Sequence, residues 1–248
     1  MPTASSVAER VALLSYAAIT MSMMALMKTL DVLGRERLVV ARESARGLYG
    51  AFEYVVAKLV TELPLDAAYA AGFGALLHWR VGLRLPSPTL VGMLALTAAC
   101  CAGLGLAVGA VAPTADTALA LGIPIMLVYM MVGVLNPAGS SPKPPSAGVR
   151  QMQRASPIRW SIRGLCCAEL RGMTLDPGSL QDAPRMGGLA LVRSGDAALA
   201  RLGLEDETAE RCATRLAQTL GVELCVAVFG LWLTRPRFQD VRETGNAV

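Results

Sequence analysis

Five stretches of mostly apolar residues recur along the chain, separated by charged or proline-rich segments. The stretches cover residues 11–27, 54–77, 90–112, 118–135 and 216–233. A helix needs about 20 mostly apolar residues to cross a hydrocarbon core of about 30 Å, so each stretch is long enough or nearly so. The pattern predicts an all-α, polytopic bundle of five membrane helices. We therefore expect an integral membrane protein of a plasma or organelle membrane, in contact with the lipid bilayer.

Composition agrees with a membrane protein and argues against a soluble domain. The 248 residues are 54% hydrophobic and only 17% charged, with a mean hydropathy of +0.47. Soluble domains carry more charge on their surfaces. The net charge of +4 therefore says less than where the charges lie.

The position of the basic residues predicts the topology. Residues 28–50 hold Lys28 and four arginines, and three more arginines follow the last stretch. Positive charge in short loops is enriched on the cytoplasmic side. We therefore expect 28–50 and the tail in the cytoplasm. The N-terminus and a long loop over 136–215 are then outside.

The second stretch carries charges that need an explanation. Lys58, Glu62 and Asp66 are spaced by four, so they share one face of a helix, and Pro64 lies among them. The sequence favours an amphipathic elbow over 47–63 with a charged stripe at the cytoplasmic interface. A buried ion-pair relay is the alternative.

Other features of the predicted spans and of the long loop bear on packing. Gly105 and Gly109 form a small-xxx-small pattern, which allows close helix approach. Pro124 predicts a kink in the fourth span, and Glu223 is an acid inside the fifth. Residues 156–170 read as a short amphipathic helix, interfacial or re-entrant. Three of the six cysteines lie in the long loop, and their disulfide state stays open: Cys166, Cys167 and Cys212.

Several chemistries lack the residues they need. None of the three lysines follows a glycine, so no GxxxxGK phosphate loop exists in this sequence. The single histidine and the absence of a CxxC pair argue against a metal site and against a hydrolase. Arginines and aromatics do not share one face, so nucleic-acid binding is not expected. We expect no catalytic site and no cofactor in this chain.

Three segments in order resemble the G-subfamily ABC transporters, the white-pigment, sterol and multidrug half-transporter group. RERLVVARESARGLYGAFEYVVAKLVTELP (35–64) matches an E…E…Y…Y…K…P pattern after the family's second helix. HWRVGL (78–83) is similar to the aromatic-x-x-Gly-Leu ending of the next helix. SPIRWSIRGLCCAELRG (156–172) resembles the family's extracellular re-entrant segment. The resemblance covers almost the whole chain.

The resemblance implies a six-helix ABC-2-type membrane domain, of which five helices are seen here. The family's nucleotide-binding domain, which uses ATP and Mg²⁺, and its first membrane helix would precede this sequence. We therefore expect a membrane-spanning subunit or fragment of an ATP-driven transporter. The ATP hydrolysis that drives the transport would take place in the missing nucleotide-binding domain.

The resemblance also assigns roles to residues. Coupling to the nucleotide-binding domain would fall to Glu36, Arg42, Glu43 and Arg46, in a helix within 37–46. A substrate cavity on a twofold axis would be lined by Thr20, Met24, Met126, Tyr129 and Met130. Val134 and Leu135 would close it toward the outside. The alternative for the coupling residues is a solvated basic loop whose charges set only the topology.

The partners implied are a second half-transporter, as a homo- or heterodimer, the nucleotide-binding domain, and a hydrophobic small molecule or lipid. Ala17 and Met24 stand where the multidrug member has phenylalanines, so stacking of flat drugs is not expected. Two competing interpretations remain. One is an ABC-2-type permease of another subfamily, which would lack the 156–172 segment. The other is a non-transporting, truncated protein that dimerises with full-length half-transporters.

Overall fold

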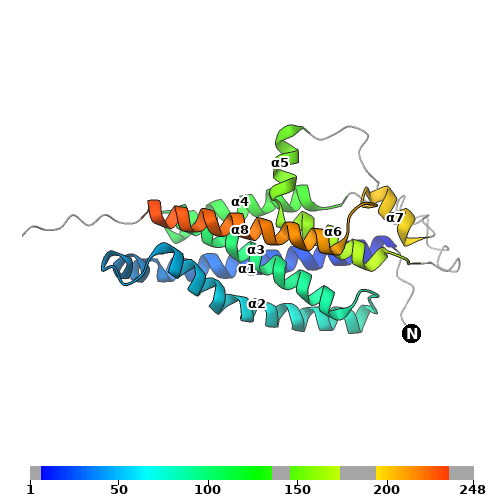
Figure 1. The fold of residues 1–248 in the computed structure, drawn as a ribbon, viewed down its shortest axis with the longest axis horizontal. Helices are drawn as coiled ribbons and strands as arrows, with labels where there is room; N and C mark the ends of the chain where they lie inside the picture. The colour runs from blue at the N-terminus through cyan, green and yellow to red at the C-terminus, as the bar shows by residue number, and fades with distance from the viewer. Residues whose placement is uncertain (1–6, 136–145, 174–193, 235–248) are drawn as a thin grey trace, which may run out of the picture.

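The computed structural model describes residues 7–135, 146–173 and 194–234. Within these ranges the chain forms eight helices (Figure 1). They are α1 (Val7–Ala45), α2 (Ala51–Val81), α3 (Ser87–Val111), α4 (Ala115–Gly133), α5 (Ala147–Ala155), α6 (Pro157–Leu170), α7 (Gly195–Leu202) and α8 (Ala209–Leu233). The long helices run side by side, and the fold is the all-α bundle that the sequence predicts.

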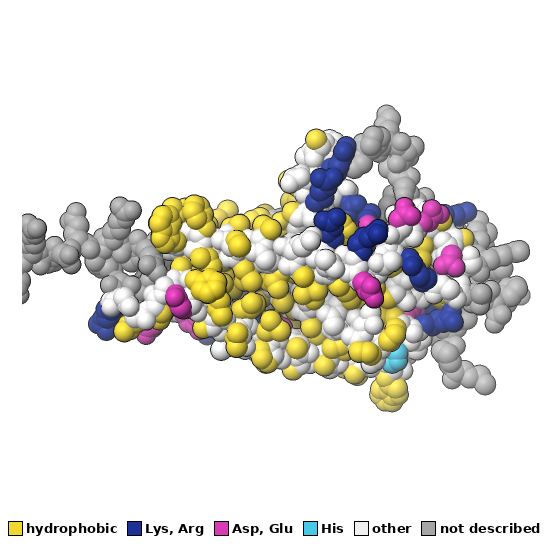
Figure 2. Space-filling model, viewed as in Figure 1, with side chains coloured by type: hydrophobic (Ala, Val, Ile, Leu, Met, Phe, Trp, Pro, Cys, Tyr) yellow, Lys and Arg dark blue, Asp and Glu magenta, His cyan; other side chains and the backbone are white. Residues whose placement is uncertain are grey.

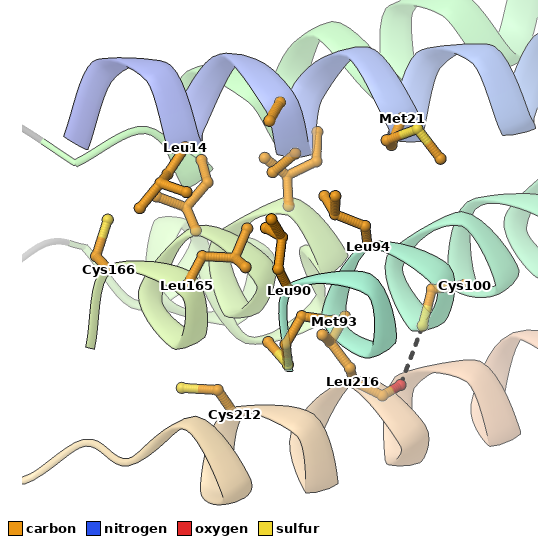
Figure 3. Packing of buried hydrophobic residues seen from close by; sticks show 14 of the residues in the cluster. Leu14, Met21, Leu90, Met93, Leu94, Cys100, Leu165, Cys166, Cys212 and Leu216 are labelled. Atoms are coloured by element: carbon orange, nitrogen blue, oxygen red, sulfur yellow. Dashed lines mark hydrogen bonds between the residues drawn. The ribbon is translucent and has the colours of Figure 1, made fainter. Parts of the chain in front are cut away.

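Helix α3 is the centre of the bundle and contacts α1, α2 and α8. It carries no charged residue, and most of its side chains are buried, as burial on all sides requires. Figure 3 shows its leucines and Met93 packed among Leu14 of α1, Leu165 of α6 and Leu216 of α8. The Sγ of Cys100 donates a hydrogen bond to the carbonyl of Leu216 at 3.1 Å, which ties α3 to α8.

The small-xxx-small pattern lies where α3 meets α1. A methyl group added at Gly105 would lie 3.0 Å from Cβ of Thr29, and one at Gly109 would lie 2.1 Å from Cδ2 of Leu33. The methyl group at Gly109 would force the end of the Leu33 side chain to move, and the contact at Gly105 would be tighter than carbon atoms usually make, so glycine favours this approach. The predicted role of the pair in close helix packing is confirmed.

Among the described residues, four helices are long and apolar enough to cross a membrane by length and composition: α1 over Val7–Glu36, α3, α4 and α8. Four of the five predicted stretches fall in these helices. The stretch 54–77 lies in α2, which is long enough at 31 residues but carries Lys58, Glu62 and Asp66 in its middle. Those charges lower its hydropathy, and they are neutralised by partners on α1.

Two expectations about local structure differ from what is observed. We expected a loop over 28–50, whereas α1 continues as one helix to Ala45. Residues 28–45 contain no proline and are rich in good helix formers, so nothing ends the helix earlier. We also expected an amphipathic elbow over 47–63, whereas α2 runs as one helix from Ala51 through Pro64 to Val81.

The predicted long loop, 136–215, includes the helices α5, α6 and α7 and the start of α8. Residues 136–145 and 174–193 lie outside the described ranges. The predicted amphipathic helix over 156–170 is confirmed as α6, but α6 is deeply buried and packs on α1, α3, α4 and α8. All six cysteines are free thiols, including the three in the long loop.

Side-chain chemistry divides the molecule along its length. Figure 2 shows hydrophobic side chains over the middle of the bundle and charged ones toward its two ends and on α5. An apolar belt between charged ends is what a bilayer-spanning bundle requires. The turn between α1 and α2 lies at one end of this belt. The α2–α3 link, α6 and α7 lie at the other (Figure 1).

Candidate functional site: a buried ion-pair network between two helices

A network of charged side chains joins α1 to α2 inside the bundle. Lys28 of α1 forms ion pairs with Asp66 and, at 3.5 Å, with Glu62 of α2. Thr29 donates a hydrogen bond to Glu62 at 3.1 Å. Asp66 is only 2% exposed, so this part of the network is shielded from solvent. Buried charges persist when they are paired in this way.

The network continues toward the end of the bundle where α1 turns into α2. Lys58 lies 3.5 Å from Glu62 and 2.7 Å from Glu36, so it links the buried acids to α1. Tyr54 also donates to Glu36, at 3.3 Å. Lys58, Glu62 and Asp66 thus form an ion-pair network with α1, in which Asp66 is buried and Lys58 and Glu62 are half-buried. We call this network the relay. Its pairing favours the ion-pair alternative, and the position of the charges at the membrane interface stays a prediction.

The end of the relay adjoins a second contact, at the turn between the two helices. The phenol of Tyr49 donates to Glu43 at 2.7 Å. Burial raises the pKa of Tyr49 to about 12, and the hydrogen bond to Glu43 and its negative charge add to this. The phenol therefore stays protonated and remains a donor. Arg42 and Arg46 are exposed beside it.

Of the four predicted coupling residues, two acids therefore have partners within the bundle and two arginines face outward. Glu36 contacts α2, and Glu43 closes the turn. Arg42 and Arg46 are open to a further protein. The two arginines therefore lie at the surface near the α1–α2 turn. Glu36 belongs to the ion-pair network with α2, and Glu43 is bonded to Tyr49 within the turn.

The predicted cavity residues do not line one space in the single chain. Thr20 and Met24 are exposed on α1, and Val134 is exposed at the end of α4. Met126 is fully buried in the core, whereas Met130 and Leu135 are half-buried against it. Tyr129 instead lines a groove shared with α8.

A second buried ion pair, at the opposite end of the bundle, was not assigned a role from the sequence. Arg10 of α1 pairs with Glu169 of α6, and Glu169 is 1% exposed. Its other oxygen accepts hydrogen bonds from the backbone N–H groups of Arg84, at 2.8 Å, and Leu85, at 2.9 Å. The CCAELRG segment shows the acid, Glu169, in the sequence. Its partners could not be read there, because they lie far from it along the chain.

These features define an integral membrane protein built as a bundle of apolar helices with a charged relay between two of them. Residues 1–170 match the family model of the ABC-2 type transporter, which is more than half of the chain. The chain therefore belongs to the ABC-2 type transporter family.

Relatives with curated names carry the G-family designation, as the sequence resemblance implied. The chain is 31% identical over 263 residues to ABC transporter G family member 7 of Arabidopsis thaliana, which covers 98% of this chain and 33% of that protein. It is 29% identical over 137 residues to ABC transporter G family member 24 of Dictyostelium discoideum, covering 53% of this chain and 11% of that protein. The chain thus spans about a third, or less, of the length of these relatives.

Proposed function

We propose that the chain is the membrane-spanning subunit of an ATP-driven transporter that moves a hydrophobic or lipid-like molecule. The observation that carries this proposal is the relay from Glu36 through Lys58 and Glu62 to Lys28 and Asp66. It connects the turn between α1 and α2 with the interior of the bundle. A membrane protein that only anchored a partner would have no need of such a path.

The relay can transmit a displacement because its members have more than one way to pair. Lys58 lies between Glu36 and Glu62, and Lys28 lies between Glu62 and Asp66. A push on the turn that separates Glu36 from Lys58 would favour the Lys58–Glu62 contact. An ATP-hydrolysing domain that binds the two states unequally would therefore shift the balance of α1 against α2.

The contact with such a domain would fall on Arg42 and Arg46, which are exposed at the end of α1 and beyond it. Arginine forms bidentate pairs with carboxylates, so an acidic surface on a nucleotide-binding domain is the complementary partner. ATP and Mg²⁺ would belong to that domain.

The substrate path would run along the exposed face of α1 and require a second half-transporter. Thr20 and Met24 face outward there, so a second chain would enclose them in a cavity. One hydroxyl beside a flexible methionine suits an apolar ligand with a single hydrogen-bonding group, such as a lipid alcohol. Met126 contributes to the packed core behind this face and does not contact the proposed ligand.

The proposal is tested with Glu43→Ala in the chain joined to its ATP-hydrolysing domain and reconstituted in proteoliposomes. We expect transport per assembled molecule to fall several-fold while expression and dimer formation stay normal. Tyr49→Phe is the matched control, because it removes the hydrogen bond at the turn but keeps the carboxylate. An equal loss in both variants would mean that Glu43 only shapes the turn.

Normal transport by Glu43→Ala would show that the acid has no part in coupling. An absence of ATP-dependent transport by the wild-type assembly would instead favour the non-transporting, dimerising protein that the sequence left as an alternative.

A further inference from the structure

A groove of about 730 Å³ runs along α8 where it faces α3, α4, α5 and α6. Its volume lies within the range of pockets that hold drug-sized ligands. The groove is separate from the exposed face of α1, because neither Thr20 nor Met24 lines it. Tyr129, which the resemblance assigned to the substrate cavity, does line it. The inference itself rests on Glu223 and its surroundings and not on the proposed function.

Glu223 is the unusual residue of this groove. It lies in the middle of α8, in the part expected to be within the bilayer, and is 7% exposed. Neither carboxylate oxygen has a hydrogen-bond partner among the described residues. A methyl group added at Gly103 would lie 3.3 Å from Oε2, so α3 leaves room for the carboxylate. Buried acids elsewhere in the chain, Asp66 and Glu169, are paired.

An unpaired acid in a membrane is expensive, and polar groups in spans are characteristically paired or functional. A molecule that enters the groove can supply the missing partner. A group with hydrogen-bond donors, above all a cation, satisfies the carboxylate best.

The lining of the groove changes from basic to apolar along α8. Arg215 lies two turns toward the outer end from Glu223, and Arg154 of α5 lies at the same groove. Val222 and Val226, with Leu104 of α3, supply apolar surface beside and beyond the acid. One wall thus offers a carboxylate, two guanidinium groups and an apolar strip within one ligand length.

We propose that this groove binds a single-chain zwitterionic amphiphile. Its ammonium group contacts Glu223, its anionic group contacts Arg154 and Arg215, and its chain lies on Leu104, Val222 and Val226. Along α8 the order is guanidinium, carboxylate, apolar strip, so the ammonium group must lie between the anionic group and the chain. Sphingosine 1-phosphate has this order, because its amine is on the carbon beside the one that carries the phosphate. A fatty acid lacks the cation, and a long-chain amine lacks the anion.

Native mass spectrometry of the purified 248-residue chain with sphingosine 1-phosphate tests the proposal. We expect one molecule to bind, and Glu223→Gln to weaken its binding about tenfold, which corresponds to 1.4 kcal/mol. Lysophosphatidic acid, which lacks the ammonium group, should bind the wild type about tenfold more weakly. Soluble phosphoethanolamine, which lacks the chain, should also bind far more weakly.

Matched variants separate the groove from general effects. Glu210→Gln removes an exposed acid of the same helix and should bind like the wild type. Val222→Trp should block the groove even if Glu223→Gln does not fold. Val60→Trp is its control, since Val60 and Val222 are each 64% exposed and Val60 lies outside the groove.

Three results would overturn the proposal. Equal binding by the wild type, Val222→Trp and Glu223→Gln would place the amphiphile elsewhere. Equal binding of lysophosphatidic acid and sphingosine 1-phosphate would remove the role of the carboxylate. No binding to the folded wild type would mean that another protein segment, and not an amphiphile, covers Glu223.

Discussion

Glu169 is a single side chain that joins three parts of the chain at the end of the bundle opposite the α1–α2 turn. It pairs with Arg10 of α1 and accepts hydrogen bonds from the backbone at the α2–α3 link. Both partners of the ion pair are almost fully buried. A buried ion pair contributes little net stability compared with apolar packing, but removing one partner strands the other charge. Glu169 therefore fixes α6 against α1 at a position where loss of the charge is costly.

We predict that Glu169→Gln destabilises the chain by about 3–5 kcal/mol, the range for breaking a buried ion pair. The midpoint of heat unfolding in detergent, followed by tryptophan fluorescence, would fall. Glu210→Gln, at an exposed acid of α8, should change stability by less than about 0.5 kcal/mol. If both variants unfolded at the same temperature, the Arg10–Glu169 pair would not be what holds α6 against α1.

At the scale of helices, small residues decide how closely α1 and α3 approach. Thr29 and Leu33 of α1 lie against Gly105 and Gly109 of α3. The same turn of α1 carries Lys28 of the relay, so the close contact also positions the charges that face α2. Packing on one side of α1 thus supports the polar contacts on another.

We predict that Gly109→Ala destabilises the bundle by about 1–3 kcal/mol, because its methyl group would overlap Leu33. Gly92→Ala is the control in the same helix, since nothing lies within 4 Å of a methyl group there. Its heat-unfolding midpoint should stay unchanged or rise, because alanine favours a helix over glycine. Equal midpoints for the two variants would show that α1 can move away from α3 without loss.

The positions of the five long helices could be predicted because apolar stretches of membrane length are a local property, whereas the short helices α5 and α7 were not predicted. The candidate coupling residues come from the spacing of the family pattern and stay a prediction, and their contacts could not be predicted from it. Tyr49 donates to Glu43 across a turn, whereas Glu169 meets Arg10 and Leu85 from distant parts of the chain. The extent of α1 was missed because charge does not end a helix. The burial of Glu223 depends on Gly103, which only the folded bundle brings near it.

At the scale of the whole molecule, the exposed side of α1 indicates where a second copy would lie. Ala12, Tyr16, Thr20 and Met24 are spaced by four and are all exposed. Tyr16 is 73% exposed, and its hydroxyl, like that of Thr20, has little reason to face lipid tails. A partner chain packed against this stripe would shelter these groups and enclose the cavity proposed above.

We predict that Met24→Cys forms a cross-link between two differently tagged copies in membranes treated with a short bifunctional thiol reagent. The background should be Cys225→Ala, because Cys225 is the exposed cysteine and the other five are buried. Leu76→Cys, on the exposed side of α2, should remain uncross-linked and serves as the control. If Leu76→Cys cross-linked as well as Met24→Cys, or if neither did in a chain shown to be dimeric, α1 would not face the twofold axis. Thr20 and Met24 would then face lipid, and the proposed substrate path between two half-transporters would have to lie on another helix.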